Sequence, residues 1–398
     1  MLFFLFLIII EVLTLIALRD KLKKRSKALF FTGVIINFIL SIWLWLLLFE
    51  TTMYKGFFDN PEHVSLLLSL TGAICAIVVP RILLILFHFT GKIIMIKRGV
   101  HIRWLTNTGL TIAALFFSVI ALGTFYGRYN FRTENVEIRI KDLNKDLEGL
   151  KIVQLSDLHL SSFYNRGMLL QKIINEVNLL KPDLILNTGD FVTFGWREFD
   201  SNDTILSKAR SLYGNFAVMG NHDFGTYHPF FTEADRSDNV LLINNMIRSS
   251  GYTLLNDTNT VVRIKGATIG LAGIITKGRH PDIKHGDLRK ALAGLDSTDL
   301  KILLSHDPNQ WEKDVVSKTD IDITFSGHTH GMQMGIYTKK FRWSPAKYFY
   351  PHWGGLFIER NQVQYVNLGL GVLAIPFRIW MPPEITLITL KREQSGLK

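Results

Sequence analysis

Four long apolar stretches dominate the first third of the chain. They cover residues 1–18, 28–49, 64–89 and 105–123. Each is close to the roughly 20 residues that a membrane-spanning helix needs. A core helix of a soluble domain would need a polar face, and a stretch such as residues 35–49 hardly has one. The pattern therefore predicts a four-helix transmembrane domain over residues 1–126.

The charges between these stretches indicate an orientation. The two loops that follow the first and the third stretch carry ten Lys and Arg residues, whereas the loop between the second and third carries only Lys55. By the positive-inside rule the ten face the cytoplasm, which places the N-terminus and everything after Gly123 outside. The first stretch has no preceding Lys or Arg and no small-residue cleavage pattern, so we interpret it as a retained anchor. We expect a bacterial inner-membrane protein whose domain after Gly123 is extracytoplasmic.

Two charged residues lie inside the apolar stretches, Glu11 in the first and Arg81 in the third. Counted from the nearest cytoplasmic cations, both fall at a similar depth. A charge in lipid is costly unless it is paired or solvated. We hypothesise an ion pair between Glu11 and Arg81. The alternative is that Arg81 reaches a shallower boundary with its long side chain.

From about residue 136 the pattern changes to short apolar strands that alternate with helical stretches. Residues 127–149 are interpreted as a short linker and a first strand, and residues 150–398 as an α/β domain. Five further strands each run directly into a cluster of Asp, Asn or His, and they are expected over residues 151–155, 183–186, 215–219, 300–304 and 322–325. Because the carboxyl ends of strands in such sheets share one rim, we expect the clusters to converge there.

The strand-end clusters offer imidazole, carboxylate and amide groups. The chain has a single cysteine, which excludes a cysteine-rich metal site. The candidate ligands are Asp157, His159, Asp190, Asn221, His306, His328 and His330. This set suits Mn, Fe or Zn, and seven ligands exceed the roughly four of one tetrahedral site. The sequence therefore predicts two divalent metal ions, which can acidify a shared water and clamp a phosphoryl group.

The ordered set of motifs resembles the five blocks of the calcineurin-like metallophosphoesterases. The blocks are Asp-Leu-His at 157–159, Gly-Asp at 189–190, Gly-Asn-His-Asp at 220–223, Ser-His at 305–306 and Gly-His-Thr-His at 327–330. Residues 149–160 and 366–390 are similar to the membrane-anchored YkuE/YaeI-type branch of that family. One departure is Met332, where this branch usually has a second glycine.

The resemblance implies an α/β sandwich with the metal site at the strand ends, and hydrolysis by attack of a hydroxide that bridges two ions. It implies two metal positions with three ligands each: Asp157, His159 and His330 for one, and Asn221, His306 and His328 for the other. Asp190 would bridge them. His222 would be the catalytic imidazole that faces the phosphate. Asp223 would orient His222, although a helix N-cap is an equally good interpretation.

Two segments suggest a lipid-linked substrate. Residues 339–353 interleave cations with aromatic residues, and four aromatic residues follow His222 at positions 224, 227, 230 and 231. A linker of about 13 residues after Gly123 reaches at most ~45 Å, which keeps the site near the membrane surface. Ordinary core and loop packing is the alternative for each segment. Weaker candidates for substrate contacts are Phe224, Arg342, Trp343 and Arg378.

The favoured function is a membrane phosphoesterase that acts on a phosphoester or pyrophosphate, with membrane lipids as partners. A variant would cleave the pyrophosphate of UDP-2,3-diacylglucosamine in lipid A synthesis, as some relatives do; that substrate is cytoplasmic and requires the opposite topology. A non-catalytic metal-binding sensor or scaffold is disfavoured by His222. A nucleic-acid partner is not expected, because the net charge of +11 lies mostly in the first 132 residues. The sequence makes no prediction of the oligomeric state.

Overall fold

The computed structural model describes residues 2–23, 25–53, 58–100, 103–276, 286–338 and 340–393. Three lysines used in the sequence analysis lie outside these ranges: Lys24 and Lys55 of the loops between apolar stretches, and Lys339 of the segment 339–353. The chain forms two compact units. The membrane unit comprises Met1–Phe57, Leu66–Tyr126 and Ala374–Ile379, and the catalytic unit comprises Phe58–Ser65, Gly127–Leu373 and Trp380–Lys398.

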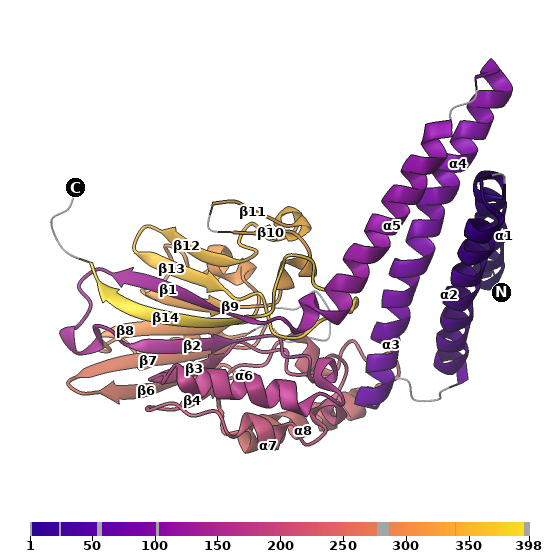
Figure 1. The fold of residues 1–398 in the computed structure, drawn as a ribbon. Helices are drawn as coiled ribbons and strands as arrows, with labels where there is room; N and C mark the ends of the chain where they lie inside the picture. Colours follow the sequence, from indigo (N-terminus) through magenta and orange to yellow (C-terminus); the bar gives the residue numbers. More distant parts are fainter. Residues whose placement is uncertain are drawn as a thin grey trace. The chain divides into compact units, whose positions relative to one another are not determined.

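The membrane unit is built from helices that match the four apolar stretches (Figure 1). They are α1 (Leu2–Leu22), α2 (Lys27–Met53), α3 (Pro61–Ala73), α4 (Val79–Arg98) and α5 (Arg103–Phe125). A π-helical turn over Ile74–Val78 joins α3 to α4, so these two form one long helix. Within the described ranges, four helices are therefore long and apolar enough to cross a membrane, as predicted.

The predicted pair of Glu11 and Arg81 is present within the membrane unit. Arg81 Nη1 lies 3.9 Å from Glu11 Oε2. Ser41 connects the two residues more closely: its hydroxyl accepts a hydrogen bond from Arg81 Nη2 at 2.7 Å and donates one to Glu11 Oε1 at 2.7 Å. Arg81 Nη2 also donates to the backbone carbonyl of Asn37 at 3.0 Å. Arg81 is 8% exposed, so its side chain is enclosed by the helices of the membrane unit.

Two six-stranded sheets form the core of the catalytic unit (Figure 1). The first contains, in spatial order, β1 (Arg132–Ile140), β14 (Glu384–Arg392), β2 (Lys151–Leu155), β3 (Leu184–Asn187), β4 (Asn215–Ala217) and β5 (Thr253–Leu254). The second contains β12 (Gly355–Glu359), β13 (Gln362–Val366), β9 (Ile323–Ser326), β8 (Leu300–Ser305), β7 (Ala267–Ile274) and β6 (Thr258–Ile264). One apolar cluster joins Ile152 and Leu184 of the first sheet to Ile302 and Ile323 of the second, so the sheets pack face to face.

Helices cover the outer faces of this sandwich. The helices α6 (Gly167–Leu179) and α8 (Glu233–Ser249) share a core with β2 and β3, and α9 (Leu288–Leu292) shares one with β7 and β8. Strands buried on both faces have no solvent-facing side, which is why β2 and β3 are mostly apolar; the buried Gln154 of β2 is satisfied by hydrogen bonds. The predicted α/β class and strand positions are confirmed, and β1 begins earlier than expected, at Arg132.

Removal of one charge of the Glu11–Arg81 pair should destabilise the membrane unit. We expect Glu11→Gln to cost about 1–3 kcal/mol of unfolding free energy in detergent, because Arg81 would stay buried without a counter-charge. The double variant Glu11→Gln/Arg81→Gln should recover part of the loss. The measurement is the thermal unfolding midpoint, with Glu50→Gln at the exposed end of α2 as the control. Wild-type midpoints for both single variants would contradict a stabilising pair.

Candidate metal centre

Two groups of side chains gather at the carboxyl ends of strands from both sheets. Asp157 and His159 follow β2, and Asp190 follows β3. The strands β2 and β3 are parallel to each other and to the next strand of the sheet, β4. His306 follows β8, and His328 and His330 follow β9, which is parallel to β8 in the other sheet. The predicted clusters therefore meet, although they come from two facing sheets and not from the rim of a single one.

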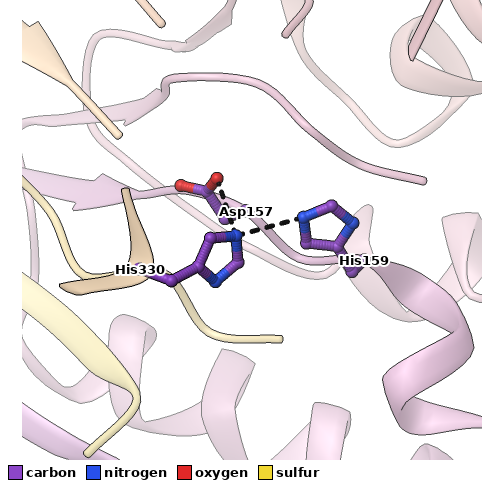
Figure 2. A group of neighbouring side chains, drawn as sticks. All are labelled: Asp157, His159 and His330. Atoms are coloured by element: carbon purple, nitrogen blue, oxygen red, sulfur yellow. Dashed lines mark hydrogen bonds and ion pairs between the residues drawn. The ribbon is translucent and has the colours of Figure 1, made fainter. Parts of the chain in front are cut away.

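The first group consists of Asp157, His159 and His330 (Figure 2). His330 Nε2 lies 3.2 Å from Asp157 Oδ1 and 3.2 Å from His159 Nε2. All three side chains are buried. Two imidazole nitrogens and a carboxylate oxygen that point at one another are a suitable ligand set for a divalent cation.

The second group consists of Asp190, His306 and His328. His306 Nε2 lies 3.1 Å from Asp190 Oδ2 and 3.2 Å from His328 Nδ1. The same Asp190 oxygen lies 3.8 Å from His159 Nε2 of the first group. One carboxylate oxygen of Asp190 thus faces both groups.

Asn221 supplies an independent test of whether the site fits a metal. Its amide nitrogen donates to the hydroxyl of Tyr227 at 3.1 Å, which fixes the orientation of the amide. Its Oδ1 is buried and has no hydrogen-bond partner among the described residues. A buried carbonyl oxygen without a donor costs free energy that a cation would offset. The predicted ligand set therefore fits divalent ions, and its members remain proposed ligands.

Each of three histidines is held through the ring nitrogen that points away from the centre. His306 Nδ1 lies 2.7 Å from the carbonyl oxygen of Thr188, and His328 Nε2 lies 2.8 Å from the hydroxyl of Tyr350. His159 Nδ1 lies 3.1 Å from Thr193 Oγ1. Such contacts fix the tautomer and the ring orientation of metal-binding histidines.

The backbone at this site is strained. Five of the seven candidate ligands have positive φ in the left-handed region: Asp157, His159, Asp190, His328 and His330. Such residues cost about 1–3 kcal/mol each and concentrate at functional sites. Gly220 shows how tightly the loops approach, because a Cβ there would lie 2.1 Å from Asp190 Oδ1. Met332 also has a positive φ, of 46°, where the related branch usually has glycine.

The charges of the buried ligands are strongly coupled. Burial would lower the pKa of His306, but Asp190 and Asp157 raise it to about 10. Burial and the neighbouring His306 lower the pKa of His328 to about 4. Burial and His330 lower the pKa of His159. Without a cation, His306 therefore carries the proton that compensates the two carboxylates, and the other two rings are neutral.

The structure separates the roles of His222 and Asp223. His222 Nδ1 lies 2.7 Å from the carbonyl oxygen of Thr193, so the prediction that Asp223 orients this ring is wrong. The Asp223 carboxylate instead accepts hydrogen bonds from backbone N–H groups, among them Gly220 N and Asp190 N at 2.9 Å each. Burial and the Asp190 carboxylate raise the pKa of Asp223, whereas the N–H groups of Gly220 and Val192 lower it. Asp223 therefore acts as a cap, as in the alternative interpretation, and holds the loops together through backbone N–H groups. It does so from the third position of the 3-10 turn over Asn221–Phe224, and not from the N-cap position.

The weaker substrate candidates lie in different places. Phe224 is partly buried and packs against the core that β2 and β3 share with α6 and α8, and its contact with substrate stays a prediction. Arg342 and Trp343 form the exposed strand β11 (Arg342–Trp343), paired with β10 (Ile336–Tyr337). Arg378 lies in the segment that belongs to the membrane unit, where its backbone N–H donates to the carbonyl of Gly123 at 3.2 Å. Contacts of Arg342, Trp343 and Arg378 with substrate stay predictions.

Sequence reasoning missed three residues that shape the site. Thr193 contacts both His159 and His222, Tyr350 contacts His328, and Tyr227 stacks on the His222 ring with centroids 4.2 Å apart. Tyr227 and Tyr350 lie in the segments flagged for their aromatic content, which is the one signal that could have found them. Thr193 has no such signal, because one of its two contacts, the one with His222, is made by its backbone carbonyl.

Comparisons with known proteins agree with this geometry. The calcineurin-like phosphoesterase family model matches residues 150–332. A "transmembrane protein with metallophosphoesterase domain" from Danio rerio is 31% identical over 295 residues, which cover 71% of this chain and 63% of the relative. The chain thus spans less than two thirds of that protein's length. The uncharacterized metallophosphoesterase YkuE of Bacillus subtilis is 30% identical over 288 residues, covering 68% of this chain and 90% of the relative.

A third relative has a name that specifies a substrate. The UDP-2,3-diacylglucosamine pyrophosphatase LpxG of Chlamydia muridarum is 27% identical over 295 residues, which cover 61% of this chain and 84% of the relative.

Metal binding should depend on pH through His306. In the metal-free protein its pKa is about 10, above the unfolded value of 6.5, so the stability that its proton contributes is present below pH 6.5 and is lost as the pH rises towards 10. A metal ion must displace that proton at neutral pH. Between pH 7 and 9 the apparent affinity for Mn²⁺ should therefore rise about tenfold per pH unit.

Isothermal titration in buffers of different ionisation enthalpy measures this proton release directly. His306→Asn should bind Mn²⁺ more weakly and without the pH dependence. An affinity that is independent of pH in the wild-type chain would contradict the assignment.

Proposed function

Because the chain belongs to the calcineurin-like metallophosphoesterase family, we propose that it hydrolyses a phosphoester or pyrophosphate with a pair of divalent metal ions. Asp157, His159 and His330 would hold one ion, and Asn221, His306 and His328 the other, with Asp190 between them. The observation that carries this proposal is the position of Asp190 Oδ2, which lies 3.1 Å from His306 Nε2 and 3.8 Å from His159 Nε2. That oxygen can serve both groups.

The chain's own residues prepare the reaction. Two bound divalent ions supply an acidified water and neutralise phosphoryl oxygens. The Thr193 carbonyl accepts the Nδ1–H of His222, which leaves Nε2 to face the substrate. Tyr227 stacks on the ring at an interplanar angle of 19° and fixes its plane. In its imidazolium form His222 then carries a second proton, on Nε2, with which it can stabilise the phosphoryl group or protonate the leaving oxygen.

Full-length protein in detergent with Mn²⁺ should hydrolyse bis-p-nitrophenyl phosphate. We expect His222→Ala to lower kcat by about 10²–10⁴-fold with Mn²⁺ binding retained, because it removes a group that acts on the phosphate and not a ligand. Asp190→Asn should lower both activity and Mn²⁺ affinity. Glu137→Gln, on the exposed side of β1, serves as the control. Tight Mn²⁺ binding without hydrolysis of this ester or of a lipid panel would favour the non-catalytic sensor.

A surface segment beside the site supports a lipid-linked substrate. After β10 and β11 the chain continues through a 3-10 turn over Pro345–Tyr348. This segment exposes Phe341 (56%), Tyr348 (71%) and Phe349 (55%) together with the cations Lys340, Arg342 and Lys347. Cations interleaved with exposed aromatic rings suit an interface that contains anionic headgroups. Trp353 is 7% exposed and belongs to the underlying core instead.

The double variant Phe341→Ala/Tyr348→Ala should separate lipid-linked from soluble substrates. We expect about a tenfold loss of kcat/KM on a lipid-linked phosphoester in anionic vesicles, and little change on bis-p-nitrophenyl phosphate, because two buried aromatic contacts with lipid are lost. Leu212→Ala, another exposed apolar residue, is the control. Equal effects on both substrates would refute a lipid-linked substrate.

The relative named as a UDP-2,3-diacylglucosamine pyrophosphatase favours a second candidate of the same chemical class, a pyrophosphate in a nucleotide-linked lipid. That candidate needs the catalytic unit in the cytoplasm, whereas the loop charges favour the outside. A topology reporter fused after Lys398 distinguishes the two.

A further inference from the structure

The catalytic unit contains a short segment that the sequence places between two membrane helices. Phe58–Ser65 comprises the three described residues before α3 and the first five residues of that helix, yet it groups with the catalytic unit. Its first two residues, Phe58 and Asp59, contact two different loops of that unit. Both loops hold His222.

The first link runs through an aromatic pair. The ring of Phe58 meets the ring of Phe194 edge to face, with centroids 4.7 Å apart and an interplanar angle of 71°. Phe194 directly follows Thr193, whose carbonyl oxygen lies 2.7 Å from His222 Nδ1 and whose hydroxyl lies 3.1 Å from His159 Nδ1. Edge-to-face pairs restrain the relative position of both rings. Phe58 therefore restrains the segment that orients His222.

The second link runs through a hydrogen bond. Asp59 Oδ1 lies 3.1 Å from His228 Nε2, and His228 Nδ1 accepts the N–H of Phe230 at 3.3 Å. Because Nδ1 acts as an acceptor, the ring proton is on Nε2, which donates to Asp59. His228 is 3% exposed, so this contact is nearly dry on the histidine side. The residue before His228 is Tyr227, which stacks on the His222 ring.

We propose that Phe58 and Asp59 are positioning residues for His222. These two residues thereby become part of the active-site scaffold. Each of them restrains the imidazole through a separate set of contacts. Phe58 acts through Phe194 and Thr193, and Asp59 acts through His228 and Tyr227. The inference rests on the proposed catalytic role of His222. It goes further in assigning a function in the reaction to residues of the catalytic unit that precede α3 in the sequence.

The first test uses single variants of the full chain in detergent with Mn²⁺ and bis-p-nitrophenyl phosphate. Phe58→Ala and Asp59→Ala should each lower kcat about tenfold and leave KM and Mn²⁺ affinity unchanged, because the imidazole is misplaced while the ligands stay. Asp59→Asn retains an acceptor oxygen for His228 and should keep nearly wild-type kcat. Glu62→Gln, an exposed residue of the same segment in the first turn of α3, is the matched control. Wild-type kcat in both alanine variants would overturn the proposal.

A double-variant cycle separates positioning from general loss of structure. If Phe58 acts through His222, then Phe58→Ala should have no further effect on the residual activity of His222→Ala. A loss of equal size in both backgrounds would show that Phe58 acts elsewhere and would overturn the inference. Failure of the wild-type chain to hydrolyse any ester would instead defeat the proposed function, so the two outcomes are distinct.

Discussion

The carboxylate of Asp223 is the constraint on which the arrangement of the site depends. It accepts four backbone hydrogen bonds, one from Gly220 in its own turn and three from the loop after β3, at Asp190, Phe191 and Val192. A fully buried carboxylate with several N–H donors is a strong organising element, because each broken bond would leave a buried polar group unpaired. It fixes the spacing between the loop that carries Asp190 and the turn that carries Asn221 and His222.

This constraint also explains how the chain maintains its backbone strain. Asp190 has a φ of 56° and sits directly in the hydrogen-bonded loop, where a left-handed residue brings the next N–H groups to face Asp223. A second buried link, from Gln154, joins the sheets beneath the site. Its amide donates to the hydroxyl of Thr188 at 3.1 Å and to the carbonyl of Ser326 at 2.8 Å. Ligands from two separate sheets can meet at fixed distances because polar contacts of this kind tie the sheets at the strand ends.

The sequence contained enough information to predict the four apolar helices, the strands and the identity of the residues that meet. Strand positions follow from apolar runs, and Asp157 or His306 can be identified because each stands directly after such a run. Contacts made through backbone atoms left no comparable signal. The carbonyl of Thr193 holds His222, and any residue has a carbonyl, so the sequence pointed to the neighbouring Asp223 instead. The division into two sheets was equally hidden, since strand periodicity does not reveal which strands pair.

The sequence could also not reveal that the two units exchange segments of chain. Phe58–Ser65, which includes the start of α3, belongs to the catalytic unit, and Ala374–Ile379 lies in the catalytic range but belongs to the membrane unit. The second segment packs closely there: a Cβ at Gly72 of α3 would lie 2.5 Å from Pro376 Cγ, and one at Gly123 of α5 would lie 3.1 Å from Phe377 Cβ. Glycine at these positions admits the segment, so each unit is complete only when it receives a piece of chain from the sequence range of the other. A cut at the end of α5 would therefore separate both exchanged segments from the units to which they belong.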